Sequence, residues 1–263
     1  GDVGSLGFAP GDHEIENDFT VTAGTVTSTS GTLQVGGNWS NTGTFNSNSG
    51  TVTFNDTAGS KTITSGGSSF NILTFDGSGG AWTLQDDLDV NSTFNLTNGT
   101  LSQGSNNDIN IAGNVTIASN GTFTKGSGTL IFDSSGTNTW SDANATKQDM
   151  GSVAVNGSSK TVNLNSDVKA TDLTVESGNT LGASSCTLNI TGSGTGSSRP
   201  FIISGTFNHQ TSLVDYTSTS TTDVEAATYY NLKINQTGTT FQLDFIDTTT
   251  NDLNIDDGTL DAT

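Results

Sequence analysis

Short runs of alternating apolar and polar residues recur along the chain, and they constrain the fold more than any other feature. Val52 and Phe54 alternate with polar residues in TVTFN, and Leu188 and Ile190 do so in TLNI. Alternation turns one face of an extended segment inward and the other toward water, which is the pattern of a β-strand. No stretch of comparable length follows a helical period. The sequence therefore predicts an all-β protein with essentially no helix.

Three long segments of the chain align with one another at a spacing of roughly 80 residues. Each segment opens with G-T-F and closes with G-T-L or N-T-L. The corresponding positions are Phe45, Phe123 and Phe207 at the openings and Leu101, Leu181 and Leu260 at the closings. The segments follow one another without a linker, so we expect one core that continues through all three.

Strand-like runs at a spacing of about ten residues suggest a sandwich, a barrel, a propeller or a solenoid. Three features favour the solenoid. Asn-Gly hairpin turns do not recur between the runs, the repeats join directly, and the inward positions are aliphatic with occasional Phe, which suits a narrow stacked core. Because parallel crossovers are right-handed by default, the prediction is a right-handed parallel β-helix of about ten coils, a single domain over residues 17–263.

The net charge limits the classes of molecule that the chain is expected to bind. The chain carries 7 Lys and Arg against 26 Asp and Glu, a formal charge of −19. Such a chain lacks the cations that neutralise phosphates, so we expect neither nucleic acid nor an anionic membrane surface as a partner. No segment is apolar and long enough to insert into a membrane. The start at Gly1 and the Ser, Thr, Asn and Gly content predict an extracellular chain, secreted after removal of a signal peptide.

The phrase W-T-L-x-x-D-L-x-V at residues 82–90, with the rhythm around it, resembles repeats of very large bacterial surface proteins. These are right-handed parallel β-helices of the adhesin and autotransporter-passenger type. The resemblance covers about residues 17–263 and carries no catalytic motif. It implies a cell-surface location and a structural or adhesive role, and it leaves host or cell-surface glycans open as partners of an adhesive form.

Enzymatic chemistry has little support in the sequence, and we expect no enzyme. A β-helix that acts on glycans would use paired carboxylates. The candidates are Asp86, Asp87 and Asp89, then Asp244 and Asp247, and then Asp256 and Asp257. We interpret each cluster as a turn or a solvated edge. No cofactor is expected, although the first cluster and the acidic C-terminal region leave a structural calcium ion open.

The two ends of the chain carry the functional hypothesis. Residues 1–16 stand outside the repeat, and they are interpreted as a disordered tail or as an arm or cap. Residues 17–26 match the segment that ends at Leu260, so the chain begins and ends at the same phase of the repeat. Exposed solenoid ends invite strand pairing, and head-to-tail contact builds an open filament.

The sequence thus predicts a structural subunit of an extracellular filament, which polymerises with copies of itself while the N-terminal arm clasps the neighbour. The alternatives are a fragment or stalk of a surface adhesin and, more weakly, a glycan-acting β-helix enzyme. The predicted polymerisation interface consists of Val3, Leu6 and Phe8 in the arm, Phe19, Val21 and Val26 at one end, and Leu253, Ile255 and Leu260 at the other.

Overall fold

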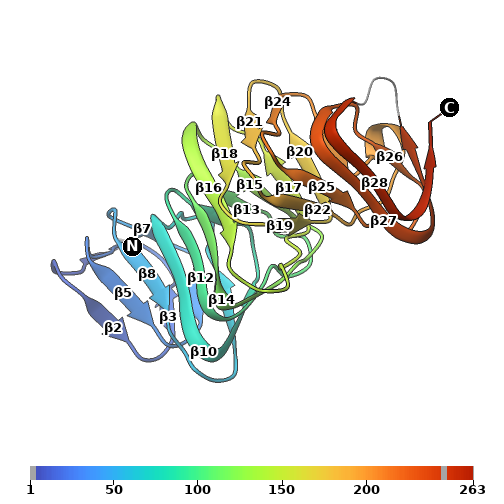
Figure 1. The fold of residues 1–263 in the computed structure, drawn as a ribbon. Helices are drawn as coiled ribbons and strands as arrows, with labels where there is room; N and C mark the ends of the chain where they lie inside the picture. The colour runs from blue at the N-terminus through green and yellow to red at the C-terminus, as the bar shows by residue number, and fades with distance from the viewer. Residues whose placement is uncertain (1–3, 244–247, 263) are drawn as a thin grey trace. The chain divides into compact units, whose positions relative to one another are not determined.

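A computed structural model describes residues 4–243 and 248–262 (Figure 1). The chain divides into two compact units, which are described separately. Unit 1 comprises Gly1–Leu130 and Ala143–Ala145, and unit 2 comprises Ile131–Asp142 and Thr146–Thr263.

The strands of unit 1 are short, except where one strand continues around a corner of the coil. They are β1 (Ser5–Gly7), β2 (His13–Ile15), β3 (Phe19–Val21), β4 (Thr25–Thr27), β5 (Thr32–Val35), β6 (Trp39–Asn41), β7 (Thr44–Asn46), β8 (Thr51–Phe54), β9 (Ser60–Thr64), β10 (Ile72–Leu84), β11 (Leu88–Val90), β12 (Phe94–Ser102), β13 (Ile109–Ile111) and β14 (Val115–Thr124). Strand β15 (Thr129–Phe132) contains the boundary between the units.

Unit 2 has the same character and includes one short 3-10 helix, η1. Its elements are β16 (Gly136–Asp142), β17 (Ser152–Val155), β18 (Lys160–Leu164), β19 (Val168–Ala170), β20 (Asp172–Val175), β21 (Thr180–Gly182), β22 (Thr187–Ile190), η1 (Gly196–Ser198), β23 (Phe201–Ile203), β24 (Thr206–Asn208), β25 (Leu213–Tyr216), β26 (Thr222–Val224), β27 (Thr228–Leu243) and β28 (Thr248–Asp261).

Parallel pairing between successive turns defines a β-solenoid. In unit 1, β2, β5, β8, β10, β12 and β14 lie side by side in that order (Figure 1). In unit 2, β19, β22, β25 and β27 do the same. The prediction of an all-β solenoid is confirmed, with about 12 turns in place of the predicted ten. The extra turns arise partly because residues before 17 also join the stack. The predicted right-handedness and the single domain stay predictions.

The core consists of ladders in which each inward side chain lies against its equivalent one turn later. Leu33 pairs in register with Val52, Val52 with Leu73, and Leu73 with Phe94. These four side chains are at most 1% exposed. Neighbouring strands lie about 4.8 Å apart, so each rung covers the next and water is excluded without a second layer. This stacking explains how so few apolar residues suffice for a core.

The repeat found in the sequence corresponds to a contact between coils. Leu101, which closes the first repeat, pairs with Phe123, which opens the second. Leu181 pairs in the same way with Phe207 at the next boundary. The G-T-L and G-T-F phrases are therefore adjacent strands of consecutive turns, and each repeat boundary lies inside a continuous ladder.

Aspartates at the corners of the coils fix the start of strands in the next turn. In each case a carboxylate Oδ1 accepts a hydrogen bond of 2.7–2.8 Å from a backbone N–H that lies 20 or 21 residues later. The pairs are Asp12 with Thr32, Asp18 with Asn38, Asp87 with Asp108, Asp108 with Thr129 and Asp167 with Thr187. Part of the acidic charge thus stabilises corners of the coils, since such N–H groups need an acceptor.

Residues 1–16 were predicted as a segment outside the repeat. The described part of this segment forms β1, which pairs in parallel with β4, and β2, which pairs with β5. Leu6 faces Val26, and Ile15 faces Val35 in register. The segment therefore extends the solenoid as the strands of its first turn. Its action as an arm or cap on another molecule stays a prediction.

The aromatic cluster around Trp39 gives a test of the stacked core. The indole is 1% exposed and lies 4.1 Å, centroid to centroid, from the ring of Phe19 and 4.7 Å from that of Phe45. Its Nε1 is buried without a hydrogen-bond partner. We expect Trp39→Ala to lower the free energy of unfolding by about 3–5 kcal/mol, whereas Trp39→Phe keeps the stacking and removes the unsatisfied N–H.

The measurement is urea unfolding followed by circular dichroism for both variants beside the unmodified chain. A loss for Trp39→Ala no larger than that for Trp39→Phe would show that the ring stack contributes little to stability.

Candidate functional site

The last turn of unit 2 has a strand edge that is unpaired among the described residues. Strand β28 pairs with β27 on one side and with no other described strand (Figure 1). Its backbone groups on the other side therefore form an open row of donors and acceptors, which is the template for adding another strand.

Two apolar side chains of β28 are exposed at this edge. Leu253 is 48% exposed and Ile255 is 47% exposed. Their register partners on β27, Leu232 and Ile234, are 1% and 0% exposed. Each exposed residue therefore has the inward orientation of the core and lacks only the next rung. The edge therefore exposes apolar side chains in the core orientation rather than polar side chains.

The two ladders that end there run through several turns of unit 2. Leu188 pairs with Val214, Val214 with Leu232, and Leu232 with Leu253. The parallel ladder passes from Ile190 through Tyr216 and Ile234 to Ile255. Residues below the last rung are buried because each has a neighbour on both sides. The exposure at β28 thus follows directly from the stacking geometry.

Acidic residues surround the exposed ladder ends. Asp252, Asp256 and Asp257 are exposed on β28. The Nζ of Lys233 lies 2.5 Å from a carboxylate oxygen of Asp256, and this contact lowers the pKa of Asp256 and raises that of Lys233. One carboxylate is therefore balanced by a cation, and the edge keeps an acidic margin around an apolar centre.

The first turn of unit 1 has a different edge. Strand β1 pairs only with β4, and β2 only with β5, among the described strands. Leu6 is 60% exposed on β1. His13 occupies an inward position of β2, where its Nε2 lies 2.8 Å from the carbonyl oxygen of Ala9 and its ring lies 5.2 Å from that of Phe8. The loop before β2 therefore contacts His13, a polar residue that occupies one ladder position of this edge.

The predicted interface residues divide according to burial. Leu6, Leu253 and Ile255 are exposed; Phe8, Val26 and Leu260 are half-buried; Phe19 and Val21 are buried; and Val3 lies outside the described residues. The burial of Phe19 depends on its stacking with Trp39 and its edge contact with Phe45. Pattern matching between the chain ends cannot detect this burial, because it depends on large rings contributed by the following turn. The interface as a whole stays a prediction.

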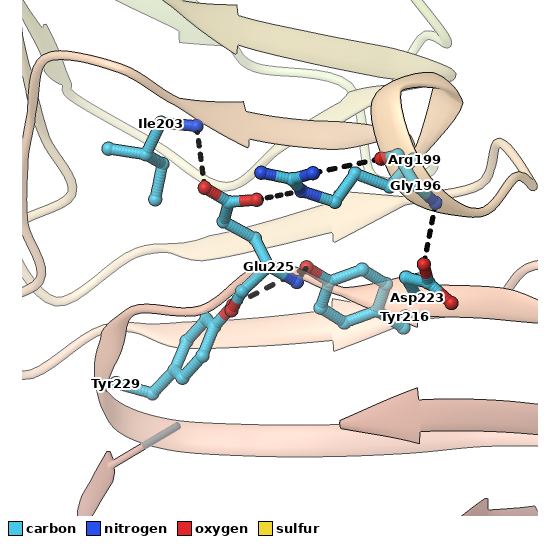
Figure 2. A network of polar contacts seen from close by, with 7 residues as sticks. All are labelled: Gly196, Arg199, Ile203, Tyr216, Asp223, Glu225 and Tyr229. Atoms are coloured by element: carbon cyan, nitrogen blue, oxygen red, sulfur yellow. Dashed lines mark hydrogen bonds and ion pairs between the residues drawn. The ribbon is translucent and has the colours of Figure 1, made fainter. Parts of the chain in front are cut away.

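A buried polar network anchors the loop that contains η1 (Figure 2). Glu225 is 3% exposed, and its carboxylate accepts hydrogen bonds from Nε of Arg199 and, at 3.0 Å, from the backbone N–H of Ile203. Arg199 also donates through Nη1 to the carbonyl oxygen of Gly196 at 2.8 Å. A buried carboxylate needs such partners, because removing it from water is otherwise costly.

Two tyrosines complete this network from the other side. The hydroxyl of Tyr216 accepts a hydrogen bond of 3.2 Å from the backbone N–H of Glu225, and the hydroxyl of Tyr229 donates to its carbonyl oxygen at 2.5 Å. Asp223 accepts from the N–H of Gly196 at 2.6 Å (Figure 2). Every drawn group binds another part of the same unit, so the network is a clamp that holds the loop against β26.

The acidic clusters considered above as candidate catalytic carboxylates make structural contacts wherever the structure describes them. Asp86 accepts hydrogen bonds of 2.7 Å from the N–H groups of Ser65 and Gly66, and Asp87 accepts one from Asp108. Asp244 and Asp247 lie outside the described residues. Across residues 4–243 and 248–262, no group of three or more His, Cys, Asp or Glu residues has an arrangement that could hold a metal ion. The calcium hypothesis gains no site there.

Asp215 stands apart because its carboxylate is poorly solvated. Its Oδ1 is buried without a hydrogen-bond partner. The side chain lies on the outward face of β25, next in register to Lys233. Burial raises the pKa of Asp215, while the nearby Lys233 cation opposes that rise. The ionised form therefore costs stability in the folded chain.

We expect Asp215→Asn to raise the unfolding temperature by a few degrees at pH 7. The folded-state pKa of Asp215 lies above the ordinary value of 3.8, so ionisation destabilises the fold above that pKa. The penalty disappears as the pH falls through the folded-state pKa toward 3.8, and the advantage of the variant should shrink in the same window. Thermal unfolding between pH 7 and pH 3.5, with Asn208→Ser on the exposed face of β24 as a surface control, measures the effect. An advantage that did not change with pH would contradict the stated cause.

Comparisons with family models, with curated proteins and with solved structures find no match to this chain. None of the helices in the described part of the structure has the length and hydropathy to cross a membrane. The fold and the exposed edges are therefore the basis for the functional proposal.

Proposed function

We propose that this protein is a structural subunit of an extracellular filament, assembled when the first turn of one copy stacks on the last turn of another. The observation that carries the proposal is the exposure of Leu253 and Ile255 on the unpaired edge of β28. An added turn would bury both side chains and pair the open backbone row, as happens at each turn within the units.

Strand direction favours a copy of the same chain as the added layer. The pairings within each unit are parallel, so a following turn continues the stack only in the same orientation. The first turn of unit 1 offers strands of matching direction, with Leu6 exposed on β1. Such a contact joins two different surfaces, and repeated contacts of this type produce an open filament.

A second candidate is the stalk of a surface adhesin, and the charge of the edges favours it. Asp12, Glu14 and Asp18 are exposed on the first turn, and Asp252 and Asp257 are exposed on the last. Like charges oppose contact between the two surfaces in dilute buffer. In a stalk, further turns would cover the ladder ends and no self-assembly would be needed.

Polar substitutions of the exposed ladder ends should weaken assembly. We expect the Leu253→Ser/Ile255→Ser double variant to form shorter assemblies than the unmodified chain, with a concentration for assembly at least about tenfold higher, because each half-exposed side chain contributes about 1 kcal/mol on burial. Sedimentation velocity over a range of concentrations and negative-stain electron microscopy measure this difference.

The matched control is Asn254→Ser, which lies between the two residues on the outward face of β28 and should leave assembly unchanged. Monomeric rods of the unmodified chain at every concentration would overturn the filament and leave the stalk. Equal assembly by the double variant and the control would show that this edge is not the contact.

Ionic strength should also control assembly. We expect association to increase when NaCl is raised from about 20 mM to about 300 mM, because salt screens repulsion between exposed carboxylates. Light scattering at a fixed protein concentration follows the change. Association that decreased with salt would instead indicate contacts between opposite charges.

A further inference from the structure

A lysine occupies a core position of unit 2. Lys160 begins β18, and its side chain points inward on the same face of the strand as those of Val162 and Leu164. The residue is 0% exposed. A buried ammonium group is costly unless it is paired or loses its proton. The groups around its Nζ therefore decide what this residue does.

The amine contacts the side-chain amide of Asn138 on β16. The Nζ of Lys160 lies 2.6 Å from Oδ1 of Asn138. Because a carbonyl bond measures about 1.23 Å, the amide carbon Cγ lies within about 3.8 Å of the nitrogen. This upper limit lies just above the range from which a nucleophile attacks a carbonyl carbon, about 3–3.5 Å.

A carboxyl group lies near enough to Lys160 for their charges to interact. Asp133 lies three residues before the start of β16, and its Oδ1 is buried without a hydrogen-bond partner. Burial raises the pKa of Asp133, and burial likewise lowers the pKa of Lys160, while their mutual attraction opposes both changes. Burial therefore disfavours the charged form of each of these two groups.

The strands hold these groups in place. Strands β16 and β18 pair in parallel, with Gly136 next to Lys160 and Asn138 next to Val162. The backbone N–H of Lys160 donates to Oδ1 of Asn179 at 2.8 Å, so β18 is fixed from the next turn as well. Because these strands are held in place, the amine and the amide stay close together and can react as parts of one molecule.

We propose that Lys160 and Asn138 react to form a side-chain amide bond that cross-links β16 to β18. The proposal rests on the 2.6 Å contact, the full burial of the lysine and the unpartnered carboxyl oxygen of Asp133. It does not depend on filament assembly, because all three residues belong to unit 2.

The reaction is an exchange of one amide for another. The lone pair of neutral Nζ attacks Cγ of Asn138, while protonated Asp133 donates to the carbonyl oxygen, and a tetrahedral intermediate forms. Asp133 takes a proton from Nζ and delivers it to Nδ2. The former carbonyl oxygen returns its proton to Asp133 as the bond from Cγ to Nδ2 breaks, ammonia leaves, and the new bond from Nζ to Cγ remains. No oxidant, reductant or further reactant is required.

The cross-link would join positions one turn apart in the solenoid. It would close a covalent loop of chain between residues 138 and 160, which restricts the unfolded chain as a disulfide does. A solenoid unfolds turn by turn, since each turn contacts only its neighbours. A covalent bond between two turns would block that route at this point.

The test is the intact mass of the purified, folded chain, followed by a tryptic map. We expect a mass lower by one ammonia than the sequence requires. We also expect a branched peptide that joins Asn138 to Lys160, with no cleavage after Lys160. Asp133→Asn keeps the shape of the site but cannot transfer the proton, so it should show the full sequence mass while remaining folded by circular dichroism. Lys160→Met should also show the full mass.

The matched control is Lys169→Met, which removes a lysine from the outward face of β19 and should keep the mass deficit. A full sequence mass for the unmodified, folded chain would overturn the proposal. So would a loss of ammonia without a branched peptide, which indicates cyclisation within Asn138. Loss of one water with a branch at Asp133 would overturn the assignment to Asn138.

Discussion

Parallel stacking of turns in register is the constraint on which the rest of this structure depends. Each residue lies about 4.8 Å from its equivalent in the next turn, so a side chain is covered mainly by residues about 20 positions away in the sequence. Ladders such as the one through Leu33, Val52 and Leu73 exclude water with a single apolar residue per turn and face. A chain with only 30% hydrophobic residues can therefore have a dry core.

The same stacking determines which hydrogen bonds the polar residues make. Corner aspartates such as Asp18 and Asp87 accept backbone N–H groups of the next turn, and Glu225 organises a buried clamp around the loop of η1. Much of the acidic character of the chain thus has a structural purpose. Asp86 and Asp87, which suggest ligand binding in the sequence, become hydrogen-bonded corners when the turns are stacked.

Stacking also explains the two places where the structure differs from a regular solenoid with a covered, apolar core. At β28 the ladders end, and Leu253 and Ile255 have the orientation of core residues without the cover of a further turn. At β18 a ladder position holds Lys160, whose amine contacts the amide of Asn138 from the preceding turn. The first feature supports a proposal about assembly, and the second supports one about covalent reinforcement.

The sequence by itself determined the class of fold, because alternation with period two and repeated phrases leave few architectures that could bury the apolar positions. It also located the repeat boundaries and the apolar character of Leu253 and Ile255. It could not determine that Phe19 and Val21 are buried, that residues 5–15 join the first turn, or that the amine of Lys160 meets the amide of Asn138. Those facts depend on the register between turns. Register is set by the lengths of the corners, and the spacing varies from 18 residues per turn between Val214 and Leu232 to 28 between Leu173 and Phe201. Only the tertiary structure decides which residues become neighbours across that distance.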